Sequence, residues 1–249
     1  MNLHYAIGAS LTNGRRYLVS RRWFPLFRNF LGGSDWAYDA CRYAGTRKFD
    51  VLLDVGANVG QTALYMRKFF PQAQIHSFEL ASQTAAELRN NTRRYPNLHA
   101  HALALGRVPG RIRIRLHESS LVNSLRYTAS ADATTATDEV EVTTADLFCA
   151  ERGLRHIDVL KTDAQGFDLD VMHGAAGLFR SRAITFVLTE VTFEETAPDA
   201  QIFQPMHDFL RGHGFHLCGI YDQYNRGSIF DCCNALYFCP AALARARAF

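Results

Sequence analysis

Long apolar runs are missing from this sequence of 249 residues: none reaches the roughly 18–20 residues that a membrane-spanning helix needs. The first residues also lack an uninterrupted apolar segment that ends in small residues, so we expect no secretory signal. None of the six cysteines has the C-x-x-C spacing of a zinc site or a redox pair. These absences together predict a reduced, cytoplasmic protein.

Lysine is scarce as well, because of 27 cationic residues only Lys48, Lys68 and Lys161 are lysines. The arginines are spread from residue 15 to residue 247 and form no stripe, so we predict no nucleic-acid partner. With 48% hydrophobic and 20% charged residues, the composition excludes disorder, collagen-like structure and coiled coil as the main class. A chain of this length buries about 70% of its surface on folding, enough for one large core.

The first 49 residues differ from the rest, and we predict that they form a basic, helical extension of a domain spanning residues 50–249. Within residues 15–31, clusters of arginine alternate with aromatic and aliphatic residues. One interpretation is an amphipathic segment that makes weak contact with an anionic membrane surface. The other is a helix packed on the domain, which is favoured because Pro25 interrupts the pattern. A second short helix is expected over residues 35–46.

From residue 51 onward, short apolar runs alternate with helical periodicity. We predict strands at residues 51–53, 75–78, 98–105, 157–160 and 184–188, and helices at residues 59–69, 82–94 and 144–152. Strands separated by helices of this length form right-handed crossovers and a parallel sheet. Residues 215–220 and 235–238 are separated by only a short polar link, which predicts an antiparallel pair at the end of the sheet. The expected class is therefore α/β.

Two segments between the third and fourth predicted strands alternate with a period of two. Residues 111–117 carry arginines on one face, and residues 138–143 carry Glu139 and Glu141 on one face. Because opposite charges across neighbouring strands stabilise by ~0.2–1 kcal/mol per pair, we predict an antiparallel pair rather than an arginine patch for nucleic acid. The long polar connection at residues 118–137 predicts a mobile flap over the active site.

The strongest local motif is Asp-Val-Gly-Ala-Asn-Val-Gly at residues 54–60, which follows a predicted strand and opens a predicted helix. Glycines at this place permit a tight turn and a close approach of the backbone to a ligand. The motif is not the G-x-G-x-x-G of dinucleotide folds, because Asn58 occupies a glycine position, and it is not a phosphate-binding P-loop. Asp54 at the strand end disfavours a pyrophosphate and suits a cationic or zwitterionic ligand.

Acidic residues also follow three other predicted strands. Glu79 ends the second strand, at a place where a carboxylate accepts hydrogen bonds from both hydroxyls of a ribose. Asp163 follows the fourth strand, two residues after Lys161, and Glu190 follows the fifth. Because ligands bind at the carboxyl ends of parallel strands, we expect these residues at one edge of the sheet.

These motifs, in this order, resemble the FkbM family of S-adenosylmethionine-dependent methyltransferases from about residue 51 to residue 191, and more loosely to residue 239. Further matching segments are Ala-Leu-Gly at 104–106, Asn-Ser-Leu at 123–125, Leu-Lys-Thr-Asp-Ala-Gln-Gly at 160–166, His-Gly-Ala at 173–175, Glu-Val at 190–191 and Asn-Ala-Leu-Tyr-Phe at 234–238. The resemblance implies a Rossmann-like, seven-stranded methyltransferase sheet with an antiparallel C-terminal strand. It also implies O-methylation of a sugar, glycoconjugate or natural product, and therefore a small-molecule or saccharide acceptor.

The resemblance implies S-adenosylmethionine as the cofactor. We expect its contacts to come from Asp54, Gly56, Ala57, Asn58, Gly60, Gln61, Glu79, Leu80 and Ala104. Asp163 and Glu190 are the candidate general bases, with Lys161 as a third catalytic candidate. The two carboxylates could instead hold a divalent cation that acidifies the hydroxyl. The residues alone leave two other functions open, namely a nicotinamide-dependent oxidoreductase and a non-catalytic nucleoside-binding module of the same fold.

Overall fold

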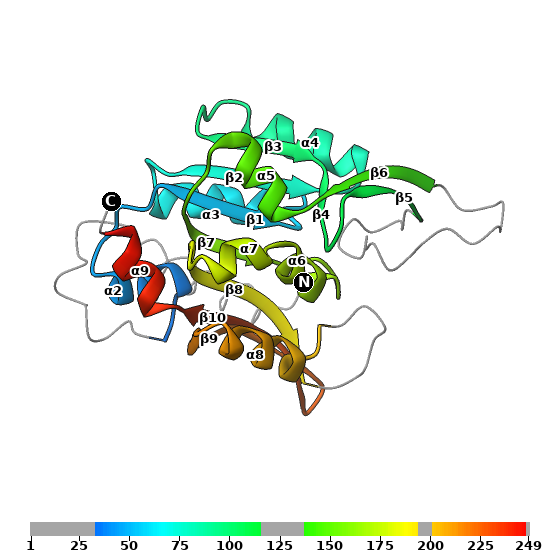
Figure 1. The fold of residues 1–249 in the computed structure, drawn as a ribbon. Coiled ribbons are helices and arrows are strands. Elements are labelled where there is room, and N and C mark those ends of the chain that lie inside the picture. Colours follow the sequence, from blue (N-terminus) through cyan, green and yellow to red (C-terminus); the bar gives the residue numbers. More distant parts are fainter. Residues whose placement is uncertain (1–32, 116–136, 194–200, 248–249) are drawn as a thin grey trace.

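A computed structural model of the chain describes residues 33–115, 137–193 and 201–247 (Figure 1). Its main sheet has seven strands in the order β3-β2-β1-β7-β8-β10-β9. The strands are β1 (Val51–Val55), β2 (Gln74–Glu79), β3 (Leu98–Ala102), β7 (Ile157–Thr162), β8 (Ile184–Thr192), β9 (His216–Arg226) and β10 (Ile229–Phe238). Only β10 runs antiparallel to its neighbours β8 and β9. The predicted mostly parallel sheet with an antiparallel C-terminal strand is therefore confirmed.

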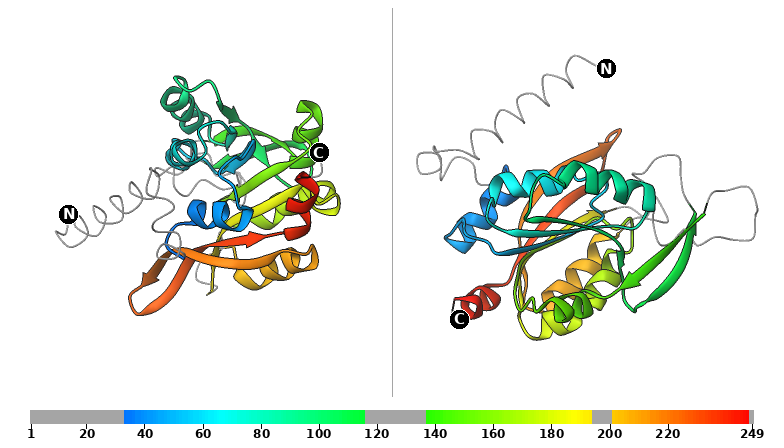
Figure 2. Two further views of the ribbon diagram at one scale, coloured as in Figure 1. Left: turned by 90° about the vertical axis from the view of Figure 1, so that its left-hand side faces the viewer. Right: turned by 90° about the horizontal axis from the view of Figure 1, so that it is seen from above.

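Helices cover both faces of this sheet, and Figure 2 shows α3 (Gln61–Phe69) and α4 (Ser82–Thr92) on one face. The other face carries α5 (Ala145–Arg152), α6 (Asp168–Gly174), α7 (Ala176–Arg180) and α8 (Phe203–Gly212). Successive side chains of β1 point to opposite faces, so Leu52 and Leu53 enter different hydrophobic clusters. A strand buried on both faces is continuously apolar, which explains the short apolar runs in the sequence.

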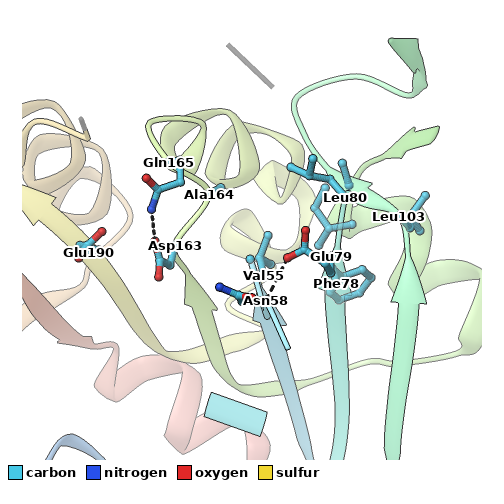
Figure 3. Close-up of a pocket in the computed structure, with 13 residues that line it drawn as sticks. Val55, Asn58, Phe78, Glu79, Leu80, Leu103, Asp163, Ala164, Gln165 and Glu190 are labelled. Carbon is cyan, nitrogen blue, oxygen red and sulfur yellow. Dashed lines mark hydrogen bonds between the residues drawn. The ribbon is translucent and has the colours of Figure 1, made fainter. Parts of the chain in front are cut away.

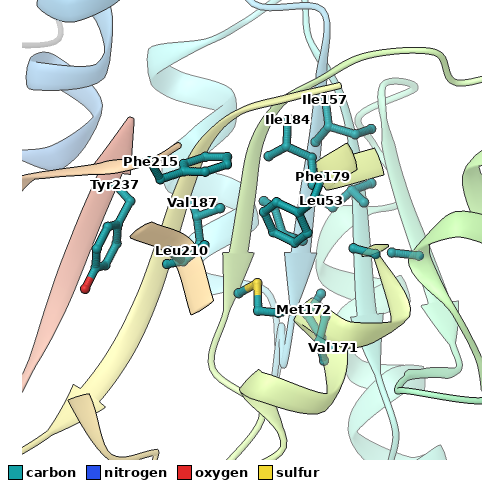
Figure 4. Packing of buried hydrophobic residues seen from close by; sticks show 14 of the residues in the cluster. Leu53, Ile157, Val171, Met172, Phe179, Ile184, Val187, Leu210, Phe215 and Tyr237 are labelled. Atoms are coloured by element: carbon teal, nitrogen blue, oxygen red, sulfur yellow. The ribbon is translucent and has the colours of Figure 1, made fainter. Parts of the chain in front are cut away.

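The larger hydrophobic cluster lies between the sheet and helices α5 to α8 (Figure 4). Leu53, Leu160 and Val187 contribute to it from neighbouring strands, and Met172 and Phe179 from the helices; all five are at most 2% exposed. This packing fixes the strands rigidly, so the loops at their carboxyl ends have fixed positions relative to one another.

The predicted helix near residues 35–46 is confirmed as α2 (Trp36–Ala44), which packs in the second hydrophobic cluster. The Asp35 carboxylate caps its first turn by accepting hydrogen bonds from the backbone N–H groups of Ala37 and Tyr38. The membrane contact proposed for residues 15–31 lies outside the described residues, and the domain boundary at residue 50 stays a prediction. Within the described ranges, no helix is both long enough and apolar enough to cross a membrane.

A small second sheet has the order β4-β6-β5, with β4 (Ala104–Leu105), β5 (Gly110–Arg115) and β6 (Thr137–Thr143). Strands β5 and β6 are antiparallel, as predicted, and an ion pair joins Arg111 to Glu139 at 3.7 Å. The third strand predicted within residues 98–105 is confirmed as β3, but it ends at Ala102, and residues 104–105 form β4, which pairs with β6. The flap predicted at residues 118–137 lies almost entirely outside the described residues.

Candidate functional site

A cavity of about 270 Å³ opens at the carboxyl ends of β1, β2, β7 and β8 (Figure 3). Figure 3 shows Glu190 and Asp163 on one side of it and Glu79 and Leu80 on the other. The remaining lining residues are Val55, Gly56, Asn58, Phe78, Leu103, Ala104, Leu105, Ala164 and Gln165. This edge of the sheet is where ligands of open α/β sheets bind.

The loop after β1 forms one wall, and its backbone is held by the neighbouring strand ends. The N–H groups of Gly56 and Ala57 both donate to the Phe78 carbonyl, at 3.0 and 2.9 Å. Gly56 has a φ of +72°, and a Cβ atom there would lie 1.9 Å from the carbonyl oxygen of Asp163. A glycine is therefore required at this position, because any side chain would separate the β1 loop from the end of β7.

Glu79 is 6% exposed and lies at the other wall. Its carboxylate accepts hydrogen bonds from the backbone N–H groups of Asn58, at 2.9 Å, and Ala81, at 3.1 Å. Burial raises the pKa of Glu79, while hydrogen bonds from the backbone N–H groups of Ala81, Asn58 and Leu80 oppose that change. The carboxylate is thereby fixed in orientation. The carboxylate keeps acceptor capacity for a ligand hydroxyl.

Lys161 is a buried cation behind the cavity, on β7. Its ammonium group lies 3.3 Å from Asp54 and 3.7 Å from Asp163, and it donates to the carbonyls of Val55 and Gly56. Burial opposes its charge, but the two carboxylates outweigh burial and raise the pKa of Lys161. Lys161 therefore carries its positive charge at neutral pH and ties the end of β7 to the β1 loop.

The carboxylates at the ends of β7 and β8 are close enough to influence one another. The Gln165 amide donates to Asp163 at 2.9 Å. Burial, the charges of Asp163 and Asp168, and a hydrogen bond with Asp163 raise the pKa of Glu190 to about 7. Burial and the Asp163 charge also raise the pKa of Asp168 to about 6. Glu190 is therefore the group whose protonation changes around neutral pH.

The sequence-predicted residues fall into two groups by position. The cavity is lined by Gly56, Asn58, Glu79, Leu80, Ala104, Asp163 and Glu190. Asp54, Ala57, Gly60, Gln61 and Lys161 do not line it, and direct cofactor contact stays a prediction for the first four. Gly60 packs instead against Leu88, since a Cβ atom there would lie 2.9 Å from the leucine side chain.

Sequence reasoning did not single out Gln165 or Asp168 for this site. Gln165 has a φ of +50°, a backbone conformation that its sequence neighbours do not predict. Asp168 is 2% exposed and accepts a hydrogen bond from the Ala164 N–H at 3.0 Å. The signal for Asp168 was its place at the start of a helix directly after the Lys-Thr-Asp segment, where a carboxylate stabilises free N–H groups.

The cavity lining is acidic, with three carboxylates from Glu79, Asp163 and Glu190 and no lysine or arginine among the described residues. Such a lining favours a cationic ligand and disfavours a phosphate. A sulfonium ion with an α-amino group and a ribose fits these residues, because the carboxylates suit both cations and Glu79 suits the ribose hydroxyls. Among the described residues, no three His, Cys, Asp or Glu side chains are arranged to hold a metal ion.

Comparison with known proteins gives a consistent result. A model of the methyltransferase FkbM domain matches residues 54–217. Methyltransferase 1 of Beauveria bassiana (strain ARSEF 2860) is 26% identical over 142 residues, covering 49% of this chain and 57% of that protein. The 2-O-methyltransferase NoeI of Sinorhizobium fredii (strain NBRC 101917 / NGR234) is 28% identical over 159 residues, covering 58% of this chain and 64% of that protein. The matches thus span less than two thirds of either relative.

Solved structures of methyltransferases are also similar to this chain. The N-methyltransferase NodS from Bradyrhizobium japonicum WM9 is 8% identical, with a TM-score of 0.47 over 82% of this chain and 94% of that chain.

Proposed function

The chain belongs to the FkbM methyltransferase family, and we propose that it is an O-methyltransferase that uses S-adenosylmethionine to methylate a hydroxyl of a sugar, glycoconjugate or natural product. The observation that carries the proposal is the acidic cavity at the carboxyl edge of the sheet. Its carboxylates favour the cationic cofactor, and they repel a phosphate-bearing acceptor such as nucleic acid. The activity for which the relative NoeI is named supports a hydroxyl as the acceptor group.

In this proposal the β1 loop and β2 hold the cofactor. Backbone groups of Gly56 and Asn58 hold its amino-acid part, and the fixed Glu79 carboxylate accepts from the ribose hydroxyls. Bound S-adenosylmethionine supplies an activated methyl group, so no acid is needed for the leaving group. The main task of the protein is to align the acceptor with that methyl group, and well-oriented reactions reach effective molarities of ~10⁵–10⁸ M.

We propose Glu190 as the general base that takes the proton of the acceptor hydroxyl. A base is most effective when its pKa lies near the working pH, and the pKa of Glu190 is raised to about 7. Asp163 suits this role less, because its carboxylate is already engaged by the Lys161 ammonium group and by the Gln165 amide. Asp163 then acts by raising the pKa of Glu190, and Lys161 holds the Asp163 carboxylate in place.

A divalent cation bridging Asp163 and Glu190 is the alternative route to an acidified hydroxyl. The two routes differ in their response to chelation. Treatment with EDTA, followed by gel filtration, leaves activity unchanged if Glu190 acts as a base. Activity that is lost to EDTA and restored by Mg²⁺ or Mn²⁺ would support the metal route and contradict our assignment of the base.

The proposed function is tested with the full chain and S-adenosylmethionine labelled in the methyl group. The acceptors are a set of glycosides, each paired with an analogue that lacks one hydroxyl. We expect mass spectrometry to find the label in a methyl ether of one glycoside and not in its deoxy partner. Titration calorimetry should show binding of S-adenosylmethionine and none of NAD. Binding of NAD alone, or label appearing on nitrogen or carbon but never on oxygen, would contradict the proposal.

A further inference from the structure

A second and larger cavity lies at the opposite edge of the main sheet, where β1, β7 and β8 begin. Its volume is about 480 Å³, and the C-terminal helix α9 (Pro240–Ala246) and the end of α2 contribute to its walls. Figure 1 shows α9 and α2 together at this end of the sheet. The six residues of β7 span ~20 Å at 3.3 Å per residue, so this cavity is well separated from the methyl-transfer site.

The charges that line this cavity are mostly positive and come from distant parts of the chain. The charged lining residues are Lys48, Arg155, Arg245, Arg247, Asp50 and Asp158. The Asp158 carboxylate is already occupied, since it accepts hydrogen bonds from the backbone N–H groups of Asp50 and Val51 at 2.7 and 3.0 Å. The lining therefore carries four cationic and two acidic side chains, and backbone N–H groups already engage one of the two carboxylates.

Two of these cations are available to a ligand. Lys48 and Arg155 both line the cavity and are exposed, so a ligand can reach their cationic groups. His156 also lines the cavity, and burial lowers its pKa despite the neighbouring Asp158 carboxylate. His156 is therefore neutral at pH 7 and shares a hydrogen bond with the Thr185 hydroxyl at 2.9 Å. The excess positive charge thus comes from the lysine and the arginines.

The floor of the cavity is apolar. Phe49 and Phe186 line it with their ring centroids 6.0 Å apart, and Leu243 of α9 lies beside them. A cavity of this volume is in the usual range for a small-molecule site, in which apolar walls supply most of the contact and a few polar groups fix the orientation. The combination of an apolar floor and a cationic rim selects a molecule with one anionic group and one apolar part.

We propose that this cavity binds a small organic anion, with its phosphate or carboxylate group held by Lys48 and Arg155 and its aromatic or aliphatic part against Phe49 and Leu243. Guanidinium groups bind both kinds of anion through paired hydrogen bonds. The ligand is not the cofactor, because S-adenosylmethionine carries a sulfonium charge that the four cations would repel. The site is thus a second binding site on the same domain.

The test uses the full chain and calorimetric titration with 1-naphthyl phosphate, 1-naphthoate, 1-naphthol and inorganic phosphate. We expect one or both aromatic anions to bind at least about tenfold more tightly than 1-naphthol and inorganic phosphate, because only they engage rim and floor together. The two anions distinguish a phosphate ligand from a carboxylate ligand. Equal affinity of 1-naphthol and both anions, or no binding of either anion at millimolar concentration, would overturn the proposal.

Variants locate the binding. The double variant Lys48→Gln/Arg155→Gln should lower the affinity for the aromatic anion at least about tenfold, which corresponds to 1.4 kcal/mol. The matched control Arg180→Gln/Arg211→Gln removes two exposed arginines elsewhere and should leave the affinity unchanged.

Ala246→Trp, which fills the cavity from α9, should also weaken binding of the anion. Equal affinities in the double variant and the control would place the anion elsewhere and refute the site. S-adenosylmethionine affinity should be the same in all variants, so this outcome is independent of the proposed methyl transfer.

Discussion

Lys161 and Asp54 face each other on the neighbouring strands β7 and β1, with the ammonium nitrogen 3.3 Å from a carboxylate oxygen. The Asp54 side chain is fully buried, and the Lys161 side chain is 7% exposed. A buried carboxylate needs a cation beside it, because transfer of an unpaired charge from water into the interior is costly. The pair therefore holds together the ends of β1 and β7, which form the candidate site. Its main role is to stabilise the fold.

We predict that Lys161→Met destabilises the protein by about 3–5 kcal/mol, because it leaves Asp54 buried without a cation. The free energy of unfolding, measured in urea, is the test. The double variant Asp54→Asn/Lys161→Met removes both charges and should recover most of the loss. A change below about 1 kcal/mol in the single variant would contradict a stabilising role for the pair.

A second prediction concerns Gly56, where the left-handed backbone and the nearby Asp163 carbonyl both require glycine. Gly56→Ala should displace the β1 loop, weaken S-adenosylmethionine binding and lower the unfolding temperature. Gly153→Ala is the matched control, because Gly153 has a similar φ of +65° and a Cβ atom added there would have no neighbour within 4 Å. The control should lose only roughly 1–2 kcal/mol of stability from the backbone conformation. Equal cofactor affinity in both variants would argue against the loop as a cofactor wall.

A third prediction concerns Glu79 and the ribose of the cofactor. Glu79→Ala removes two charge-assisted hydrogen bonds, each worth ~1.5–3 kcal/mol. Calorimetry should therefore show S-adenosylmethionine binding at least ~10²-fold more weakly. Glu87→Ala, on the exposed side of the following helix, is the control and should bind as the wild type does. If Glu79→Ala keeps the wild-type affinity, the ribose assignment is wrong.

Much of the fold could be predicted from the sequence because buried parallel strands leave a direct signal. The apolar runs at residues 51–53 and 157–160 identify β1 and β7, and the helical periodicity of residues 59–69 identifies the helix that follows β1. The positions of Glu79, Asp163 and Glu190 at strand ends then place all three at one edge, since parallel strands end together. The hydrophobic pattern of each strand was sufficient for this prediction, because the position of each acidic residue at the sheet edge depends only on where its own strand ends.

Features that depend on two distant segments could not be predicted in the same way. The chain leaves the main sheet after Ala102 without a proline or glycine to mark the break, and only pairing with β6 explains it. Asp54 and Lys161 are paired because of the register between β1 and β7. The cationic cavity joins residues 48, 155 and 245–247, whose spacing in the sequence carries no pattern.

The last prediction is the pH dependence of methyl transfer. The pKa of Glu190 is raised to about 7, so below that pH the side chain is protonated and cannot accept the hydroxyl proton. With the true acceptor, kcat should fall as the pH decreases through about 7, while the affinity for S-adenosylmethionine changes little. Glu190→Gln should lower kcat by ~10²–10⁴-fold and remove this limb of the profile.

Asp163→Asn gives the decisive comparison for this prediction. The Asp163 charge and its hydrogen bond are among the causes that raise the pKa of Glu190. Their removal should therefore shift the fall in kcat to lower pH and make Glu190 a weaker base.

The pH dependence of stability provides a second readout. Because the folded state holds the Glu190 proton more tightly than the unfolded state, stability should fall as the pH rises from 4.5 towards 7. Glu190→Gln should reduce that fall. If the pH at which kcat falls is the same in Asp163→Asn and in the wild type, Asp163 does not raise the pKa of Glu190 during turnover, and that part of the proposal is wrong.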